Sequence, residues 1–161
     1  MLLDETGEIA ETWERVPDEA DIPAEGAIIV PLARLEEAMG GRPASGVAIP
    51  NDADVRELVP LFPRIGLIAV DFPSFADGRG FSLGQRLRDL GFKAGLRAEG
   101  PVIADQFAYL LACGFDQVDV SEDVALRQPV EQWLAQLGKI SLGYQRGRPT
   151  QSIPDQRRAY A

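Results

Sequence analysis

Residues that could bind an anion follow two apolar runs in the middle of the chain. Arg79 lies in the polar loop FADGRGFS behind the first run, and Arg97 ends the second run. A guanidinium binds a tetrahedral oxyanion through paired N–H donors, and the start of a helix adds unpaired backbone N–H groups. Ser82, together with Gly78 and Gly80, is typical of such a helix start. We therefore expect an anion-binding site made of Arg79, Ser82, Arg97, Gly78 and Gly80.

Further polar residues could support this site from the same loops and from the helices that follow them: Asp71, Asp77, Arg86, Asp105 and Gln106. Asp71 directly follows an apolar strand pattern, and Asp105 stands near the start of a helix pattern. Either carboxylate could act as a general base, a role that a positioned acid can fill. The spacing identifies no catalytic residue, so the catalytic residues stay unknown.

Each of these residues also has an ordinary structural interpretation. An Asp–Gly pair is typical of a turn, and Asp77 can form a local charge pair with Arg79 that shapes the loop. Arg97 can equally pair with Asp71 or Asp105 and lock neighbouring strands. An acid in the first turn of a helix, such as Asp105, also suits the helix dipole. Both interpretations remain open at this point.

The elements that must position these residues alternate between apolar strands and helices. Apolar runs predict strands at residues 27–30, 45–50, 66–72, 92–100 and 116–120, and helical patterns separate them. We therefore expect an α/β fold with a mostly parallel sheet of about five strands, either an open doubly wound sheet or a half-barrel. The loops that leave the carboxyl ends of parallel strands meet at one edge of the sheet, where ligands bind. A short N-terminal strand or hairpin is expected around residues 2–3 and 12–16.

Serine and proline set the expected ends of the helices. Ser82 is expected to cap the helix that follows it. Residues 52–64 have apolar side chains at helical spacing, and Pro60 and Pro63 should shorten or bend the end of that helix. The last helix is expected to continue through Pro129.

The composition removes several kinds of chemistry. The chain has no histidine, which excludes Ser-His-Asp and Cys-His catalysis and the usual zinc sites. A single cysteine, Cys113, excludes an intrachain disulfide and a four-cysteine iron–sulfur cluster. Cys113 stands on an apolar helix face, where a buried and unreactive thiol is expected. We expect neither a metal nor a bound cofactor.

The net charge of −9 is unevenly distributed along the chain. Residues 1–26 have nine acidic residues against one arginine, whereas residues 143–161 have four arginines against one aspartate. Nucleic-acid binding needs clustered lysine and arginine, which the rest of the chain lacks. No apolar run approaches the ~20 residues that cross a bilayer, and the acidic start is unlike a signal peptide. We expect a cytoplasmic protein with a single domain over residues 1–142 and a flexible basic tail over residues 143–161.

The string from FADGRGFS to CGFD resembles a bacterial family of unknown function whose members are encoded beside assimilatory sulfite reductase. The residues that carry the resemblance are Phe75, Asp77, Gly78, Arg79, Ser82, Arg86, Leu87, Arg88, Gly95, Leu96, Arg97, Ala98, Gly100, Val102, Asp105, Gln106, Cys113, Gly114, Phe115 and Asp116. The run IIVPLARL is also similar, so the resemblance covers about residues 27–120. The family often has a basic residue before its cysteine, where this chain has Ala112.

The resemblance implies a place in sulfur assimilation and in sulfite reduction, often described for this family as oxidoreductase activity, but it implies no catalytic residue. We expect an accessory protein that binds sulfite reductase, its electron donor or a small sulfur oxyanion. The alternative is a small enzyme that acts on a phosphorylated or sulfated metabolite through an arginine-lined anion site. The chain could also form a homodimer through aromatic residues such as Phe107, Tyr109 and Trp133. Whether the protein is an enzyme is left open.

Overall fold

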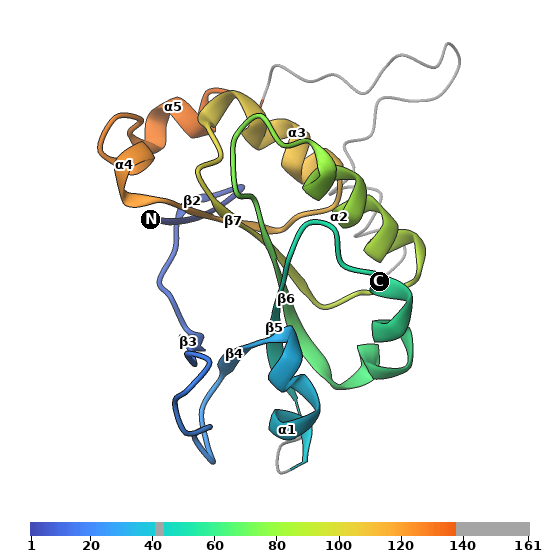
Figure 1. The fold of residues 1–161 in the computed structure, drawn as a ribbon. Coiled ribbons are helices and arrows are strands. Elements are labelled where there is room, and N and C mark those ends of the chain that lie inside the picture. Colours follow the sequence, from blue (N-terminus) through green and yellow to red (C-terminus); the bar gives the residue numbers. More distant parts are fainter. Residues whose placement is uncertain (41–43, 138–161) are drawn as a thin grey trace.

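The computed structural model describes residues 1–40 and 44–137 and has an α/β fold. A curled sheet of eight strands forms a half-barrel, and helices cover its outer side (Figure 1). The α/β class is therefore confirmed, and the sheet is larger than the expected sheet of about five strands. The expected basic tail, residues 143–161, lies outside the described residues. Among the described helices, none is long and apolar enough to cross a membrane.

Six of the strands run parallel to one another and follow the order of the chain across the sheet. They are β3 (Glu14–Arg15), β4 (Ile28–Pro31), β5 (Ser45–Ile49), β6 (Ile65–Asp71), β7 (Gly95–Gly100) and β8 (Gln117–Val120). β1 (Leu2–Asp4) lies antiparallel to β8, and β2 (Gly7–Glu8) pairs with β1 at the edge. The N-terminal hairpin is therefore β1–β2, whereas the strand expected around residues 12–16 lies at the opposite edge.

The helices lie in the connections between the parallel strands and after the last strand. They are η1 (Leu32–Arg34), α1 (Leu35–Met39), η2 (Val55–Arg64), α2 (Arg79–Asp89), η3 (Ala104–Gln106), α3 (Phe107–Ala112), α4 (Glu122–Ala125) and α5 (Val130–Leu134). A helical connection lets one parallel strand return to pair with the next. The outer face of the sheet is covered in this way.

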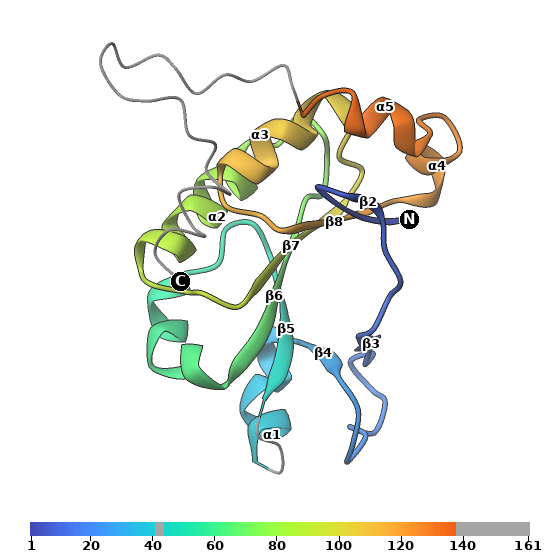
Figure 2. The ribbon, with the colours of Figure 1, turned by 180° about the vertical axis from the view of Figure 1, so that it is seen from behind.

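The connection from β2 to β3 requires the sheet to curl. These two strands lie at opposite edges of the sheet, and only residues 9–13 join them. The six Cα–Cα steps from Glu8 to Glu14 span about 22 Å when fully extended. A flat sheet of eight strands would separate its edge strands by about 33 Å. Residues 9–13, which we call the crossing segment, therefore run across the open side of the half-barrel, as the blue trace shows in Figures 1 and 2.

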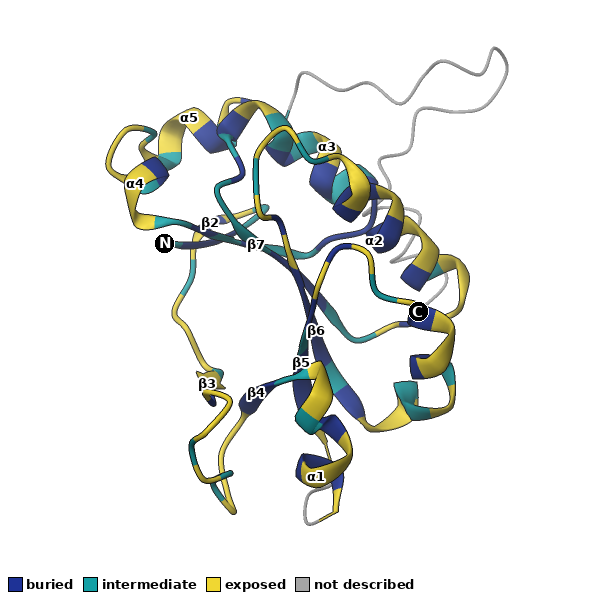
Figure 3. Ribbon diagram, in the orientation of Figure 1, coloured by how far each residue is buried: buried dark blue, intermediate teal, exposed yellow. Residues whose placement is uncertain are grey.

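The two faces of the sheet bury different sets of side chains. The outer face packs under the helices and belongs to the main core. Its side chains are those of Ile28, Val30, Val47, Ile68, Val70, Leu96 and Ala98. The alternate positions Ile29, Leu67 and Ala69 form a second cluster with Trp13 and Ala48 on the inner face. Successive strand residues point to opposite faces, so both faces are buried, one by helices and one by the crossing segment. Figure 3 shows the resulting contrast between buried strands and exposed outer helix surfaces.

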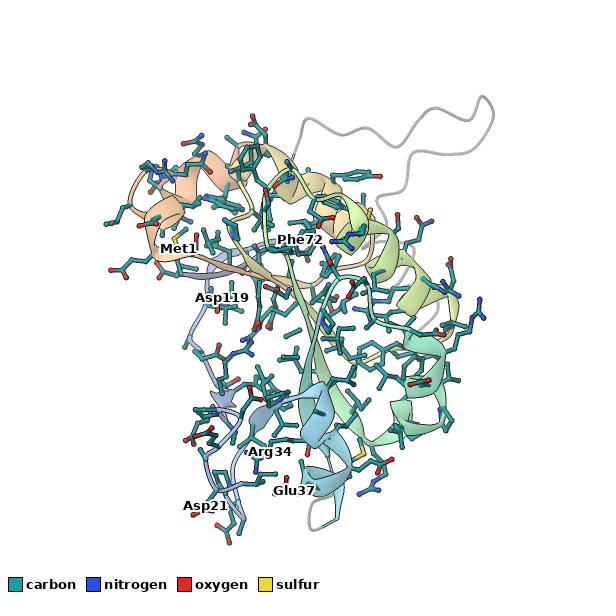
Figure 4. The ribbon with its side chains drawn as sticks, viewed as in Figure 1. Met1, Asp21, Arg34, Glu37, Phe72 and Asp119 are labelled. Atoms are coloured by element: carbon teal, nitrogen blue, oxygen red, sulfur yellow. The ribbon has the colours of Figure 1, made fainter. Side chains whose placement is uncertain are left out.

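Arg34 fixes the irregular chain that follows β3. Its guanidinium donates to the Pro17 and Ala20 carbonyls at 3.0 and 2.6 Å and pairs with Glu37 at 3.0 Å (Figure 4). The Glu37 hydrogen bond raises the pKa of Arg34, and the same bond lowers the pKa of Glu37. The hydrogen bonds from Arg34 hold the backbone on both sides of Asp18, and so they also position Asp18.

Ser82 does not cap a helix. α2 begins at Arg79 and its N-cap residue is Gly78, so Ser82 lies exposed inside the helix. The glycine-bearing loop already adopts helical backbone angles at Gly78, with φ of −79° and ψ of −5°. The N-cap residue is therefore Gly78, four residues before the expected Ser82.

Prolines account for the other differences between expected and observed helices. η2 is a 3-10 helix over its full length, and the rings of Pro60 and Pro63 inside it would clash with the carbonyl groups four residues earlier in an α-helix. The last helix is divided at Pro129, which is the N-cap residue of α5. The expectation that this helix continues through Pro129 is therefore wrong.

Candidate functional site

Arg79 is exposed at the first turn of α2 and forms a local ion pair. It pairs with Asp77 at 2.7 Å and with Asp52 at 3.5 Å. The Asp77 carboxylate also accepts the backbone N–H of Arg79 at 3.1 Å. Hydrogen bonds from the Arg79 guanidinium, from Asn51 and from this N–H hold the pKa of Asp77 well below its usual range. This pair shapes the loop before α2, in agreement with the structural alternative.

The glycines beside Arg79 have different surroundings. Nothing lies near the position that a Cβ of Gly78 would take. At Gly80, a Cβ would overlap the ring of Phe72, which is fully buried behind the helix. Gly80 thus lets α2 approach β6 closely, whereas Gly78 is exposed at the helix start.

The supporting residues Arg86, Asp105 and Gln106 lie on α2 and η3. Arg86 is exposed on α2, and Asp105 is exposed in the first turn of η3. Gln106 donates to the Phe75 carbonyl at 2.7 Å and accepts from the Ile103 N–H at 3.1 Å. Gln106 therefore ties the loop after β6 to the start of η3.

Arg97 lies on the inner face of the sheet, where its side chain is only 2% exposed. Its guanidinium forms two hydrogen bonds with the Glu11 carboxylate, at 2.6 and 3.0 Å. The Gln117 amide oxygen accepts two more hydrogen bonds at 3.2 Å each. Glu99 lies 3.9 Å away. The partner of Arg97 is thus Glu11 of the crossing segment, rather than Asp71 or Asp105.

The structure does not bring Arg79 and Arg97 together. Arg79 has its partners in the loops after β5 and β6, and Arg97 has its partners on β7, β8 and the crossing segment. No partner is shared between these two groups. One anion between both guanidinium groups is therefore not part of this geometry, although anion binding at either arginine stays a prediction.

A pocket of about 410 Å³ opens at the carboxyl ends of the parallel strands. Its lining residues come from the ends of the six parallel strands and from the chain after β3: Arg15, Asp18, Pro31, Ala48, Ile49, Pro50, Asp71, Glu99 and Asp119. Asp71 is in register with Glu99, and Glu99 is in register with Asp119. The carboxylates of three neighbouring strands therefore stand side by side at the rim of the half-barrel.

The three rim carboxylates differ in their electrostatic surroundings. Burial raises the pKa of Glu99, although Arg15 and Arg97 act to lower it. A carboxylate oxygen of Asp119 lies 3.6 Å from the N-terminal ammonium of Met1, and Figure 4 shows the two residues close together. Asp71 is exposed, and its side-chain carboxylate makes no hydrogen bond or ion pair with any described residue. Asp71 is therefore the rim carboxylate that is free to accept a donor from a ligand or partner.

The pocket has an excess of negative charge. It is lined by four carboxylates and by Arg15, which already pairs with Glu99. Such a surface attracts ammonium and guanidinium groups and repels free anions. Over residues 1–40 and 44–137, no group of three acidic, cysteine or histidine side chains is arranged to hold a metal ion.

Cys113 is buried at the end of α3, in agreement with the expectation of a buried thiol. Burial raises the pKa of this thiol, although a hydrogen bond with Tyr109 acts to lower it. A thiol with a raised pKa is mostly protonated at neutral pH and therefore a weak nucleophile.

The sequence-based site lacks Glu11, Arg15 and Glu99. A usable signal existed for Glu99, because β6, β7 and β8 each have an acidic residue close to their carboxyl end. No local signal links Glu11 with Arg97, since 86 positions separate them in the chain. The shape of the half-barrel brings them together.

Comparison with known proteins places the chain in a family. Residues 46–153 match the model of a family described as bacterial protein of unknown function (DUF934). This agrees with the expected bacterial family of unknown function, whereas the expected link with sulfite reduction stays a prediction. No curated protein and no solved structure matches the chain.

Proposed function

We propose that this chain, which belongs to the bacterial family DUF934, is an accessory protein of assimilatory sulfite reduction that works by binding a partner protein. The partner is sulfite reductase or its electron donor, and the chemistry of reduction takes place there. The pathway is proposed from the resemblance to a family encoded beside assimilatory sulfite reductase. The mode of binding is proposed from the acidic pocket at the strand ends.

The observation that carries this proposal is the charge of the pocket at the strand ends. Asp18, Asp71 and Asp119 are partly or fully exposed, and the single arginine of the lining is paired with Glu99. A basic side chain of a partner can therefore enter the pocket and pair with Asp71. Complementary charge of this kind raises the rate of encounter and fixes the orientation of two proteins.

An enzyme that grips an anionic metabolite is the second candidate, and the geometry supports it less. The pocket at the strand ends is the place where such a substrate is expected in this fold class. Its lining has four carboxylates, which repel a phosphate or sulfate group. Partner binding needs no anion in this pocket, and so it fits the same residues better.

The direct test is association of the tagged protein with sulfite reductase of the same organism. Replacement of two exposed pocket residues, Asp18→Asn with Asp71→Asn, should weaken the association by about tenfold, because two charge pairs are lost. The matched control is Asp89→Asn with Glu131→Gln, which removes two exposed acids outside the pocket. Association that is absent in the wild type, or equal for both double variants, would contradict the proposal.

The pathway has its own test in growth. Loss of the gene should slow growth when sulfate is the only sulfur source, and it should leave growth on sulfide unchanged, because sulfide enters after sulfite reduction. The wild-type gene should restore growth on sulfate, and the Asp18→Asn, Asp71→Asn variant should restore it poorly. Equal growth of the deletion strain on both sources would remove the pathway from the proposal.

A further inference from the structure

The Glu11 carboxylate occupies a small polar site on the inner face of the half-barrel. One of its oxygens accepts the backbone N–H groups of Thr12 and Trp13, at 2.9 and 2.8 Å, and a guanidinium N–H of Arg97 at 3.0 Å. The other oxygen accepts the second Arg97 nitrogen at 2.6 Å. Two backbone N–H groups and a bidentate guanidinium thus bind one carboxylate, and this is the arrangement of a binding site for an oxyanion.

The guanidinium of this site is fixed more firmly than the carboxylate that fills it, whereas the two backbone donors belong to the same segment as Glu11. Arg97 is 2% exposed, and the Gln117 amide oxygen holds its guanidinium from the neighbouring strand. The Glu11 side chain is 44% exposed and belongs to a segment without helix or strand. The carboxylate therefore lies between the buried guanidinium and the solvent, and it can leave without any change in the sheet.

We propose that Arg97 and the backbone N–H groups of Thr12 and Trp13 form an oxyanion-binding site, which Glu11 fills as an internal substitute for the free ligand. A small oxyanion enters this site when the Glu11 side chain turns out to solvent. The ligand is a carboxylate or an inorganic sulfur or phosphorus oxyanion of similar size. The Glu11 contact then works as an autoinhibitory contact, since it competes with the ligand for the same donors.

The charges around the site fit such an exchange. Arg15, Glu99 and Arg97 form a chain of alternating charge on the inner face, and Glu11 completes it. When Glu11 turns away, the remaining three groups carry one net positive charge, which an anion neutralises. Burial makes this compensation necessary, because an unpaired guanidinium away from water is costly. The site does not depend on the partner binding proposed above, which uses the acidic rim.

The alternative is that the Glu11–Arg97 pair only fastens the crossing segment. Both interpretations predict that loss of the carboxylate destabilises the protein. They differ in whether a free anion can replace the lost group. Glu11→Ala opens the space of the carboxylate, whereas Glu11→Gln removes the charge and keeps the space filled.

The test measures the midpoint of thermal unfolding in sodium acetate and in sodium sulfate, each against sodium chloride at equal ionic strength. Acetate and sulfate should raise the midpoint of Glu11→Ala by at least about 3 °C over chloride, because a ligand of the folded state stabilises it. Wild type and Glu11→Gln should show less than half of this shift. The control Glu14→Ala, an exposed acid next to the crossing segment, should show only the general salt effect that wild type shows.

Equal midpoints of Glu11→Ala in acetate, sulfate and chloride would overturn the proposal. An equal shift in Glu11→Gln or Glu14→Ala would overturn it as well, because the effect would then be a general effect of salt. If Glu11→Ala is unfolded in chloride, refolding in acetate or sulfate supports the site, and failure to refold in either anion contradicts it. Isothermal titration of folded Glu11→Ala with acetate should give one site per chain.

Discussion

The Glu99 carboxyl lies between two arginines, and yet its pKa is raised, because burial outweighs the attraction of Arg15 and Arg97. Its neighbour Asp119 raises the pKa further. A raised pKa means that the folded protein holds this proton more tightly than the unfolded chain does. The ionised form of Glu99 therefore lowers the stability of the folded state at neutral pH.

The difference in free energy of unfolding between Glu99→Gln and wild type should change with pH, because only wild type has the carboxyl that titrates. The contribution of Glu99 is fully present below its ordinary pKa of 4.5 and is lost as the pH rises through the raised folded-state value. The free energy of unfolding of Glu99→Gln, relative to wild type, should therefore increase from about pH 4.5 to about pH 7. Urea unfolding of both proteins at the two pH values measures it. A difference that stays constant or falls over this range would contradict the assignment.

The residues of the site could be predicted only in part from the sequence. The local pair of Asp77 with Arg79 follows from an Asp–Gly turn and from two neighbouring charges, and the structure has it. The pairing of Arg97 with Glu11 could not be predicted, because it depends on how the sheet curls. Residue type alone does not distinguish an arginine that is free for a ligand from one that already has a carboxylate.

α2 packs against the sheet through glycines that face large rings. A Cβ at Gly80 would overlap the ring of Phe72, and a Cβ at Gly84 would overlap the ring of Phe115. Both phenylalanines are fully buried, and their rings contact each other at a centroid distance of 5.8 Å. The distance between helix and sheet is therefore set by the absence of side chains at two helix positions.

Gly80→Ala should lower the free energy of unfolding by about 1–3 kcal/mol, the usual cost of overpacking a filled core. Gly78→Ala is the matched control, since the added methyl meets nothing within 4 Å and the backbone angle is negative. Its effect should stay within about 0.5 kcal/mol. Chemical unfolding measures the free energy of unfolding of both variants. Equal losses in Gly80→Ala and Gly78→Ala would mean that Gly80 has no packing role.

The crossing segment is fastened to the inner face by Trp13 as well as by Glu11. The Trp13 ring lies over two glycines of neighbouring strands, where an added Cβ would stand 3.1 Å from it at Gly46 and 2.9 Å at Gly66. The glycines therefore provide the shallow surface on which the ring lies. Larger residues there would lift the segment off the sheet.

Trp13→Ala should loosen the chain at β3 and leave the outer helices unchanged. The N–H groups of Glu14 and Val16 donate to carbonyls of Ala27 and Ile29 beside the segment. Hydrogen exchange at these two amides should become at least about tenfold faster, because local opening no longer has to expose the indole ring. Exchange within α2 should not change. Unchanged exchange at β3, or equal acceleration across the sheet, would show that the ring does not fasten the segment.

Most of the fold was accessible from the sequence at the scale of elements. Strands β4–β8 are buried on one or both faces, so that their apolar runs stand out from the polar connections. β2 and β3 have two residues each, too few for any periodicity. Their places at opposite edges follow from long-range pairing, which a local pattern does not contain.

At the scale of the whole molecule, acidic charge is concentrated on one rim of the half-barrel. The chain carries a net charge of −9, and the segments that close the open side come from its most acidic part. Four carboxylates line the pocket at that rim. A protein with this distribution approaches a basic partner in a preferred orientation, which agrees with the proposed docking to a partner protein.

Docking through the acidic rim is best tested by the affinity of the wild-type protein for sulfite reductase, measured by titration at two salt concentrations. Between about 0.1 M and about 1 M salt the screening length falls from about 10 Å to about 3 Å. We expect binding at the lower concentration and an affinity at least about tenfold weaker at the higher one, because the proposed encounter is driven by charge at the acidic rim. Absence of binding at the lower salt concentration, or an affinity that does not change with salt, would contradict it.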